Sequence, residues 1–300
     1  MAQSRRIRMP QITQTGIELQ QLTQPKFCWE HFERLTAERL ERILEKEQYR
    51  TIPFWDRSTL SEEEKKQVSK FESITSFGGT IANLFEDMMN SLGYVPTQRE
   101  YVMKGIEITQ DWWFDNRNNP KVKGLPFNTV VRKACAERLA RTWVSNIVEL
   151  HTRLLIKDTM PHLKVYTHDL LDLVAGVDLV VEDDVKRYYV HIFKNTSWGM
   201  KAYQQKQKRG GLFKGRQFIR YQRDFNGDIA LAYEWDTRTD HSTTKFINGI
   251  PLFKSEFIEW KFNIIKKLPT VGESLMTPQS KLDRLNDWLQ HHFGQTVNFN

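Results

Sequence analysis

The stretch that decides the fold runs from Val165 to Lys194 and reads V-Y-T-H-D-L-L-D-L-V-A-G-V-D-L-V-V-E-D-D-V-K-R-Y-Y-V-H-I-F-K. It predicts a polar turn, a short helical segment over His168–Leu173, and two strands joined by a charged hairpin. The first strand covers Val177–Val181 and carries one acid, Asp178, and the second covers Tyr188–Lys194. A carboxylate and an ammonium at the edges of apolar runs are costly to bury without compensation. A divalent metal together with a phosphate would compensate both charges.

Side chains of a strand alternate between its two faces. One face of the second strand is therefore expected to carry Val190, Ile192 and Lys194, and the other Tyr189, His191 and Phe193. The structural alternative for Asp178 and Lys194 is a buried ion pair between neighbouring strands. Such pairs occur, but they seldom stabilise a fold on balance.

The segment G-V-D-L-V-V, followed by a strand that ends in lysine, resembles the core of the PD-(D/E)xK nuclease superfamily. This is the fold of most type II restriction endonucleases, in which an Asp on one strand and a Glu/Gln-x-Lys on the next build the site. The resemblance assigns Asp178 and Lys194 as catalytic residues. The chain departs from the pattern at Ile192, where the family usually has Glu or Gln. The identity of the second metal ligand therefore stays open.

The resemblance implies hydrolysis of a phosphodiester with Mg²⁺, a hard cation that prefers oxygen ligands. Asp178 would hold the metal, and the backbone carbonyl of Phe193 would add a second oxygen. Lys194 would orient the attacking water and offset charge in the transition state. A single carboxylate supplies few ligands for a metal ion, so a second acid is expected from elsewhere in the chain. The first choice is Glu86, as a catalytic residue and metal ligand, and the secondary candidates are Asp169, Glu137 and Glu149.

The choice of Glu86 rests on the segment Thr75–Gly93. Thr80 can cap a helix with a wide apolar face, and Gly93 can end it. This helix resembles the first core helix of restriction-type nucleases, whose Glu often points into the site. The alternative is that Glu86 is a solvated helix charge.

The stretch from Asn195 to Arg223 contains no acidic residue. Its cations alternate with aromatic residues, and R-G-G-L-F-K-G-R within it predicts a flexible cationic loop. Basic side chains neutralise phosphates, and aromatic rings can stack on bases. The alternative is a solvated charged face. The candidate DNA-binding residues are Trp198, Lys201, Tyr203, Lys206, Lys208, Arg209, Lys214, Arg216, Arg220 and Arg223.

The rest of the chain is mostly helical by its apolar spacing and capping signals. Residues 94–102 are expected to be extended, and a loop that mixes aromatics, amides and cations is expected from Asp111 onward. A strand is predicted over Asp228–Trp235. Helices are predicted over Trp29–Gln48, from Ser61 to about Ser73, from Asn128 to about Lys157, and over Ser255–Lys267 and Ser280–His292.

The bulk composition is that of a soluble globular protein. The chain has 300 residues, of which 39% are hydrophobic and 27% charged, with 44 Lys and Arg against 37 Asp and Glu. The net charge of +7 favours polyanionic partners. Neither a membrane-spanning run nor a signal peptide is predicted. The two cysteines, Cys28 and Cys135, fit a reducing compartment, and the prokaryotic cytoplasm is the expected location.

The sequence therefore predicts an α/β protein with a mixed central β-sheet flanked by helices, a restriction-endonuclease-like core and an N-terminal helical extension. Residues 1–74 would form the arm and extension, and residues 75–300 the nuclease-like domain. The expected function is that of a Mg²⁺-dependent type II endonuclease that cleaves double-stranded DNA as a homodimer. The alternatives are a DNA-binding protein with a degenerate nuclease core and no catalysis, which Ile192 favours, and a structure-selective repair nuclease.

Overall fold

The computed structural model describes residues 32, 34–49, 55–74, 81, 83–120, 122–167, 177–182, 187–209, 228–235 and 241–267. These residues fall into two compact units. The first contains the described residues from 42 to 147 together with residue 32, and the second contains residues 34–41 and the described residues from 148 onward. The division falls within the long helix α6 (Thr129–Thr159).

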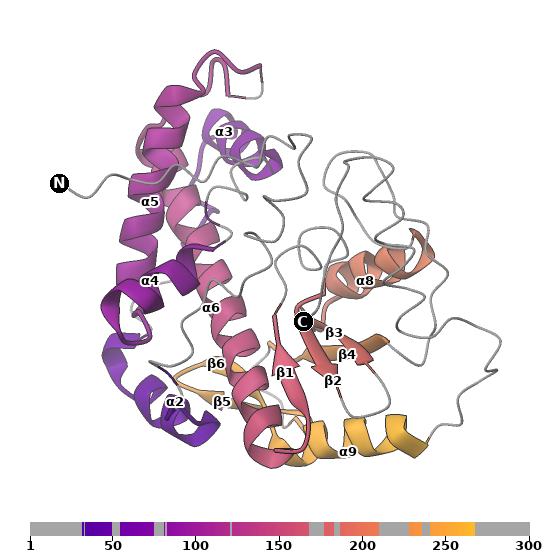
Figure 1. Cartoon of the computed structure of the whole chain (residues 1–300). Helices are drawn as coiled ribbons and strands as arrows, with labels where there is room; N and C mark the ends of the chain where they lie inside the picture. Colours follow the sequence, from indigo (N-terminus) through magenta and orange to yellow (C-terminus); the bar gives the residue numbers. More distant parts are fainter. Residues whose placement is uncertain are drawn as a thin grey trace, which may run out of the picture. The chain divides into compact units, whose positions relative to one another are not determined.

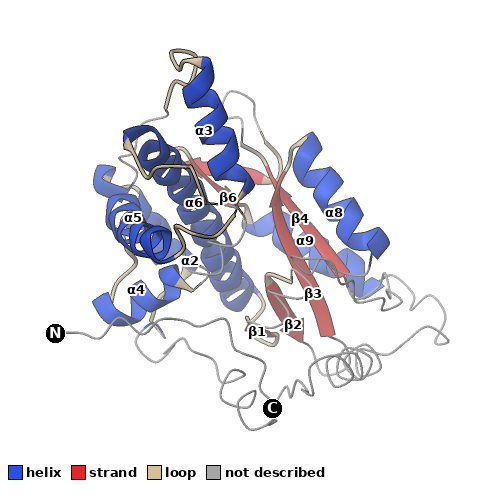
Figure 2. Cartoon of the chain, turned by 90° about the horizontal axis from the view of Figure 1, so that it is seen from above, coloured by secondary structure: helices blue, strands red, loops and turns tan. Residues whose placement is uncertain are grey.

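The first unit is helical. It contains the 3-10 turn η2 (Glu47–Tyr49), α3 (Glu62–Ser73), α4 (Leu84–Leu92), α5 (Gln98–Asp115) and the first part of α6. Figures 1 and 2 show α5 and α6 side by side. They run antiparallel, since Trp143 Nε1 near the middle of α6 donates to the carbonyl of Pro96 before α5, at 2.9 Å. A Cβ on Gly105 would lie 2.6 Å from the side chain of Leu139, so this glycine lets the two helices approach closely.

The helix starts of the first unit are set by local side-chain caps. Ser61 and Glu64 form the predicted capping box of α3, and Asn128 Oδ1 accepts from the N–H of Val131 at the start of α6, at 3.0 Å. Gly93 ends α4 with a φ of 73°. These predictions are confirmed. Thr80, the predicted cap of α4, lies outside the described residues.

Two predictions for residues 94–115 are wrong. Residues 98–102, expected to be extended, and Asp111–Asp115, expected to be loop, all belong to α5. The start of the helix is a second capping box, in which Thr97 and Glu100 bond reciprocally. The buried residues of α5 recur at helical spacing: Gln98, Tyr101, Val102, Gly105, Ile106, Thr109 and Trp113.

The second unit is built on a four-stranded mixed sheet with the order β1-β2-β3-β4. The strands are β1 (Lys164–Tyr166), β2 (Leu179–Glu182), β3 (Arg187–Lys194) and β4 (Asp228–Tyr233). The first three are antiparallel neighbours, whereas β4 runs parallel to β3. A parallel neighbour needs a crossover connection, and α8 (Ser197–Arg209) lies in it. The predicted α/β class with a mixed sheet is confirmed.

Helices pack on both faces of this sheet. Tyr203 of α8 stacks on Phe193 with ring centroids 4.9 Å apart. On the opposite face, Tyr188 contacts Phe262 of α9 (Ser255–Lys267), with centroids 6.3 Å apart. Because strand residues alternate, these two contacts place α8 and α9 on different sides of β3, and Figure 2 shows α8 alongside β3 and β4. Burial on both faces explains the continuous apolar run of β2.

A second, two-stranded sheet consists of β5 (Thr244–Ile247) and β6 (Ile250–Phe253). Asn248 and Gly249 connect the strands with φ values of 49° and 69°. Two successive positive φ values are typical of the tight hairpin turns that Asn-Gly favours. The predicted helix after this segment is confirmed as α9.

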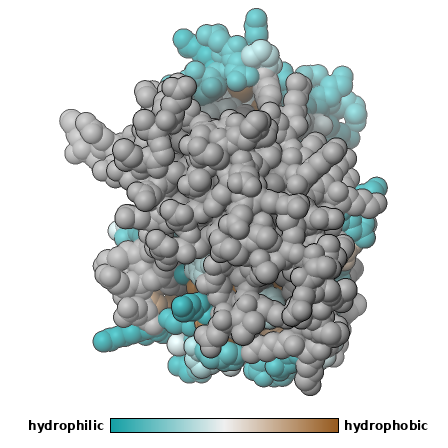
Figure 3. Space-filling model, turned by 45° about the vertical axis from the view of Figure 1, so that its right-hand side comes forward, coloured by the Kyte–Doolittle hydropathy of each residue, from teal (hydrophilic) through white to brown (hydrophobic). Residues whose placement is uncertain are grey.

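Helix α2 (Ala37–Leu44) is shorter than the predicted helix over residues 29–48. Asp158 of α6 fixes its start, because Asp158 Oδ2 accepts from the N–H of Ala37 at 2.7 Å. The predicted helices at 168–173 and 280–292 lie outside the described residues. None of the helices in the described part of the chain combines the length and apolar character that a bilayer crossing requires. On the face shown in Figure 3, the visible side chains of described residues are mainly hydrophilic.

A buried polar cluster joins three elements of the second unit. Glu41 of α2 bonds His151 Nε2 of α6 at 2.7 Å and Lys245 Nζ of β5 at 2.6 Å. Burial lowers the pKa of His151, which is fully buried. Burial alone would raise the pKa of Glu41, but its bonds to His151 and Lys245 outweigh this effect and lower it. A proton on His151 Nδ1 would find no acceptor among the described residues.

This cluster predicts acid sensitivity. In the unfolded chain His151 takes up a proton near pH 6.5, whereas in the folded protein its lowered pKa keeps it neutral to a lower pH. The contribution of neutral His151 to the free energy of unfolding is therefore complete above pH 6.5 and decreases as the pH falls below that value. Protonation of Glu41 in the unfolded chain also lowers the free energy of unfolding, once the pH falls below the unfolded pKa of 4.5. We expect the free energy of unfolding, measured by urea titration, to fall between pH 7.5 and about 5. His151→Gln should flatten this slope, whereas the exposed control His162→Gln should not. Equal slopes in all three proteins would contradict the prediction.

Candidate active site

Asp178 lies just before β2, where the regular pairing with β3 is interrupted. Its N–H donates to the carbonyl of Val190 at 2.9 Å, although the strand register pairs Val190 with Leu179. Two successive residues therefore face a single residue of β3, which is the arrangement of a β-bulge. Bulges change the direction of a side chain relative to strict alternation. The position of Asp178 on one sheet face therefore does not follow from counting residues along β2.

The carboxylate of Asp178 is part of the sheet's hydrogen bonding. Its Oδ2 accepts from the backbone N–H of Ile192 at 2.5 Å. In a regular ladder that N–H would donate to a backbone carbonyl of β2. Asp178 thus replaces a backbone acceptor at the point where the ladder ends. A carboxylate has about four lone-pair sites, so this bond uses only part of its capacity.

The direction of the Phe193 carbonyl follows from the strand pairing. Successive backbone groups of a strand point to opposite neighbours. The N–H of Ile192 points toward β2, where Asp178 accepts it, so the carbonyl of the next residue, Phe193, points toward β4. The N–H of Asn195 confirms this alternation by donating to the carbonyl of Tyr233 in β4, at 2.8 Å. The Phe193 carbonyl is therefore directed away from Asp178.

Lys194 ends β3, as the sequence predicted. Its Nζ lies 3.9 Å from the ring centroid of Trp235, which follows β4. The face of an indole ring attracts a cation through the quadrupole of the ring. This contact holds the ammonium at the ends of β3 and β4, beside the turn into α8.

Glu234 is an acid at this site that the sequence analysis did not select. Its side chain accepts from Asn195 Nδ2, immediately after Lys194, and its N–H donates to the hydroxyl of Thr244 at 3.1 Å. Glu234 lies beside the end of β3 because parallel strands end at the same edge of a sheet and Glu234 directly follows β4. The signal in the sequence was an acid near the end of the predicted strand D-I-A-L-A-Y-E-W.

The turn from β3 into α8 brings the backbone of the helix unusually close to the end of the strand. The hydroxyl of Thr196 accepts from the N–H of Gly199 at 3.0 Å and caps the helix. A Cβ added to Gly199 would lie 2.3 Å from the backbone carbonyl oxygen of Lys194. The first turn of α8 therefore passes directly over the end of β3, and only glycine fits at this position.

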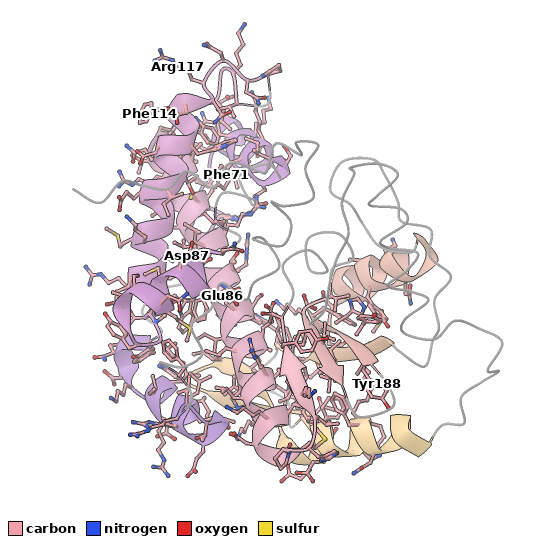
Figure 4. All side chains as sticks on the ribbon, viewed as in Figure 1. Phe71, Glu86, Asp87, Phe114, Arg117 and Tyr188 are labelled. Atoms are coloured by element: carbon pink, nitrogen blue, oxygen red, sulfur yellow. The ribbon has the colours of Figure 1, made fainter. Side chains whose placement is uncertain are left out.

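The structure places the other predicted acids on several elements. Glu86 lies in the first turn of α4, in the first unit (Figure 4), and Asp178 and Lys194 belong to the second unit. Glu137 pairs with Arg57, with its Oε2 at 2.5 Å from Nη2, and so has a structural role in the first unit. Glu149 is half-buried on α6 in the second unit, and Asp169 lies outside the described residues.

The predicted DNA-contacting stretch is helical in its first part. Residues 197–209 form α8, for which no helix had been predicted, and Lys201 is exposed on it. Tyr203, a candidate DNA contact, is buried against Phe193 and His191. The described side chains do not include those of Trp198, Lys206, Lys208 and Arg209, and Lys214, Arg216, Arg220 and Arg223 lie wholly outside the described residues.

Among the described residues, no group of three or more His, Cys, Asp or Glu side chains is placed to hold a metal ion. Of the predicted donors in the second unit, the Phe193 carbonyl faces β4. Asp178 remains as a carboxylate donor of the predicted set at the edge of this sheet.

Comparisons with known proteins leave the family open. No protein-family model matches the chain, and neither curated proteins nor solved structures contain a match.

Proposed function

We propose that this protein is an endonuclease that hydrolyses phosphodiester bonds in double-stranded DNA, with a restriction-endonuclease-like core and type II site specificity. The observation that carries the proposal is the meeting of three charged residues at one edge of the sheet. Asp178 precedes β2, Lys194 ends β3, and Glu234 follows β4. Strand β2 is antiparallel to β3, so the start of β2 lies beside the end of β3. Strand β4 is parallel to β3, so the two strands end at the same edge of the sheet.

These residues suit phosphodiester hydrolysis. The ammonium of Lys194 would stabilise the charge that develops on the phosphate, and such groups act strongly when a site is preorganised. Trp235 and the close turn at Gly199 hold the strand end on which Lys194 lies. A carboxylate at this edge, Asp178 or Glu234, would accept a proton from the attacking water. The exposed Lys201 on α8 adds positive charge for the DNA backbone.

A DNA-binding protein without catalysis is the second candidate, and a specific observation favours it. Asp178 is bonded to the backbone of Ile192, and the Phe193 carbonyl is turned toward β4. A nuclease core that has lost its metal would retain such a carboxylate for its structural role. The cationic composition of α8 and of the stretch after it would then serve binding alone.

Digestion of plasmid and phage DNA, with Mg²⁺ and with EDTA, tests the proposal. We expect discrete fragments from the wild type, and at least about a 100-fold slower cleavage by Lys194→Met, since removing one stabilising group from a preorganised site has effects of this size. Lys157→Met, which removes an exposed lysine of α6 in the same unit, should cleave normally. Binding is measured in parallel by a salt titration of fluorescent duplex DNA.

Each outcome of this experiment decides between the candidates. Salt-sensitive binding without cleavage under any metal condition would favour the non-catalytic DNA-binding protein. Cleavage that depends on DNA structure rather than sequence would favour a repair nuclease. Full activity of Lys194→Met would show that the site lies elsewhere in the chain.

A further inference from the structure

Helix α5 carries two of the most exposed large apolar side chains in the described part of the chain. Met103 and Phe114 are each 58% exposed. They lie eleven residues apart, about 16 Å along the helix at about 1.5 Å per residue. Phe114, labelled in Figure 4, lies at the end of α5. Large apolar side chains that gather on one exposed face indicate an interaction surface.

Four residues of α5 follow the spacing of a coiled-coil seam, and of these Met103, Glu107 and Phe114 are exposed and Gln110 is half-buried. Met103, Glu107, Gln110 and Phe114 recur at intervals of four, three and four residues, which is the a/d pattern of a heptad repeat. They lie on the side of α5 away from its buried residues Tyr101, Val102, Gly105, Thr109 and others. We call these four residues the α5 stripe. The stripe therefore lies mainly on the exposed side of the helix, where Met103, Glu107 and Gln110 line a groove together with Met88 and Leu92 of α4.

The α5 stripe is complementary to a second copy of itself. A two-fold axis between Glu107 and Gln110 would make the two helices antiparallel and would bring Met103 opposite Phe114 of the second copy. The same axis would bring the carboxylate of Glu107 opposite the amide of Gln110, which can donate to it. Each of the four positions thus meets a chemically suitable partner, as an isologous interface requires.

The charges that flank the stripe also fit this arrangement. Lys104 and Asp111 lie seven residues apart on the same flank of α5, so an antiparallel copy would place Lys104 of one chain beside Asp111 of the other. Lys104 Nζ already lies 2.8 Å from Glu107 Oε1 within its own helix. Charges of opposite sign at such flanking positions select the partner and its orientation.

A groove next to the stripe has room for the opposing aromatic ring. Its volume is about 580 Å³, and Met88, Leu92 and Met103 contribute its apolar wall, together with charged residues of α5 and Arg132 of α6. All these residues belong to the first unit. Because Phe114 of a second copy would lie opposite Met103, its ring would enter this groove. Methionine side chains adapt readily to such a ring.

We propose that the α5 stripe and its groove form the interface of a two-fold homodimer, with the two α5 helices antiparallel. The proposal does not depend on the chemistry at the sheet edge. It predicts a contact between copies that the first unit makes by itself. A different occupant, such as a basic amphipathic peptide, would leave the wild type monomeric on its own.

Sedimentation equilibrium of the full chain tests the oligomer. We expect the wild type to dimerise, and Phe114→Ser to raise the dimer dissociation constant at least about 30-fold, because buried aromatic anchors dominate interfaces. Lys104→Asp and Asp111→Lys should each weaken the dimer about tenfold, and the double variant should restore most of the affinity. Trp260→Ser, which removes a 55% exposed aromatic residue of α9, is the matched control and should not change it. A monomeric wild type at about 100 µM, or a double variant weaker than both single variants, would overturn the proposal.

Disulfide trapping tests the orientation. Chains that carry Lys104→Cys and chains that carry Asp111→Cys, both in a Cys28→Ser background, are mixed and oxidised. Cross-links should form between the two kinds of chain and not within either kind alone, because a disulfide needs Cα atoms within about 7 Å. With the axis between Glu107 and Gln110, positions 104 and 111 of different chains would be offset by about 3 Å along the helix axis, whereas two copies of position 104 would be about 13 Å apart and two copies of position 111 about 8 Å apart. Cross-links between like chains only would overturn the proposed geometry.

Discussion

Replacing Asp178 with Asn is expected to reduce DNA cleavage at least about 100-fold while the protein stays folded. The reason is the double role of this carboxylate. Its Oδ2 accepts from the N–H of Ile192 at the end of the β2–β3 ladder, and an amide oxygen can do the same. The negative charge, however, would be lost, and with it any interaction with a metal ion or an attacking water. Cleavage rates on plasmid DNA and the urea midpoint of unfolding measure the two effects separately.

Asp178→Ala is the comparison that separates the roles. It removes the acceptor as well as the charge, so the N–H of Ile192 is left without this partner, at a cost of about 1–3 kcal/mol. We expect Asp178→Ala to lose both stability and cleavage, and Asp178→Asn to lose cleavage alone. Unchanged cleavage by a folded Asp178→Asn protein would restrict this residue to its structural role and would move the proposed chemistry to Glu234.

Gly199→Ala is expected to lower the free energy of unfolding by about 3 kcal/mol or more, or to prevent folding of the second unit. The added methyl group would lie 2.3 Å from the carbonyl oxygen of Lys194, far inside van der Waals contact. That oxygen is a backbone atom at the end of β3, so it cannot move without disturbing the pairing with β4. Urea unfolding followed by circular dichroism measures the loss.

Two controls define the cause of this effect. Met200→Ala changes the next residue of the same helix, which is 37% exposed, and should cost little. Gly105→Ala would meet only the flexible side chain of Leu139, so a smaller loss than for Gly199→Ala is expected. If Gly199→Ala were as stable as Met200→Ala, the close passage of α8 over the end of β3 would be contradicted.

Helix boundaries with local caps could be predicted from the sequence. The capping box at Ser61, the cap at Asn128 and the stop at Gly93 each depend on residues within one turn of the helix end. The strands β2 and β3 were also predicted to within two residues at each end, because their apolar runs are flanked by charged turns. In these cases local and tertiary preferences agree.

Helices α5 and α8 were missed for two different reasons. For α5, the aromatic cluster of residues 112–114 was interpreted as a loop, although the Thr97 capping box marked a helix start. For α8, the many cations and glutamines hid the spacing of its buried residues. Gly199 and Tyr203, which form its contact with β3, lie four residues apart on one face. A short amphipathic pattern of this kind becomes clear only when its packing partner is known.

The sequence alone determined that this α/β protein with a mixed sheet has two neighbouring strands, with Lys194 at the end of one and Asp178 next to the other, because apolar runs and charged turns act over a few residues. The tertiary structure decided how these residues are used. The bulge at Asp178, the direction of the Phe193 carbonyl and the arrival of Glu234 beside Asn195 all depend on strand pairing between segments far apart in the chain. Such pairing is fixed by the packing of both sheet faces, which no local pattern encodes.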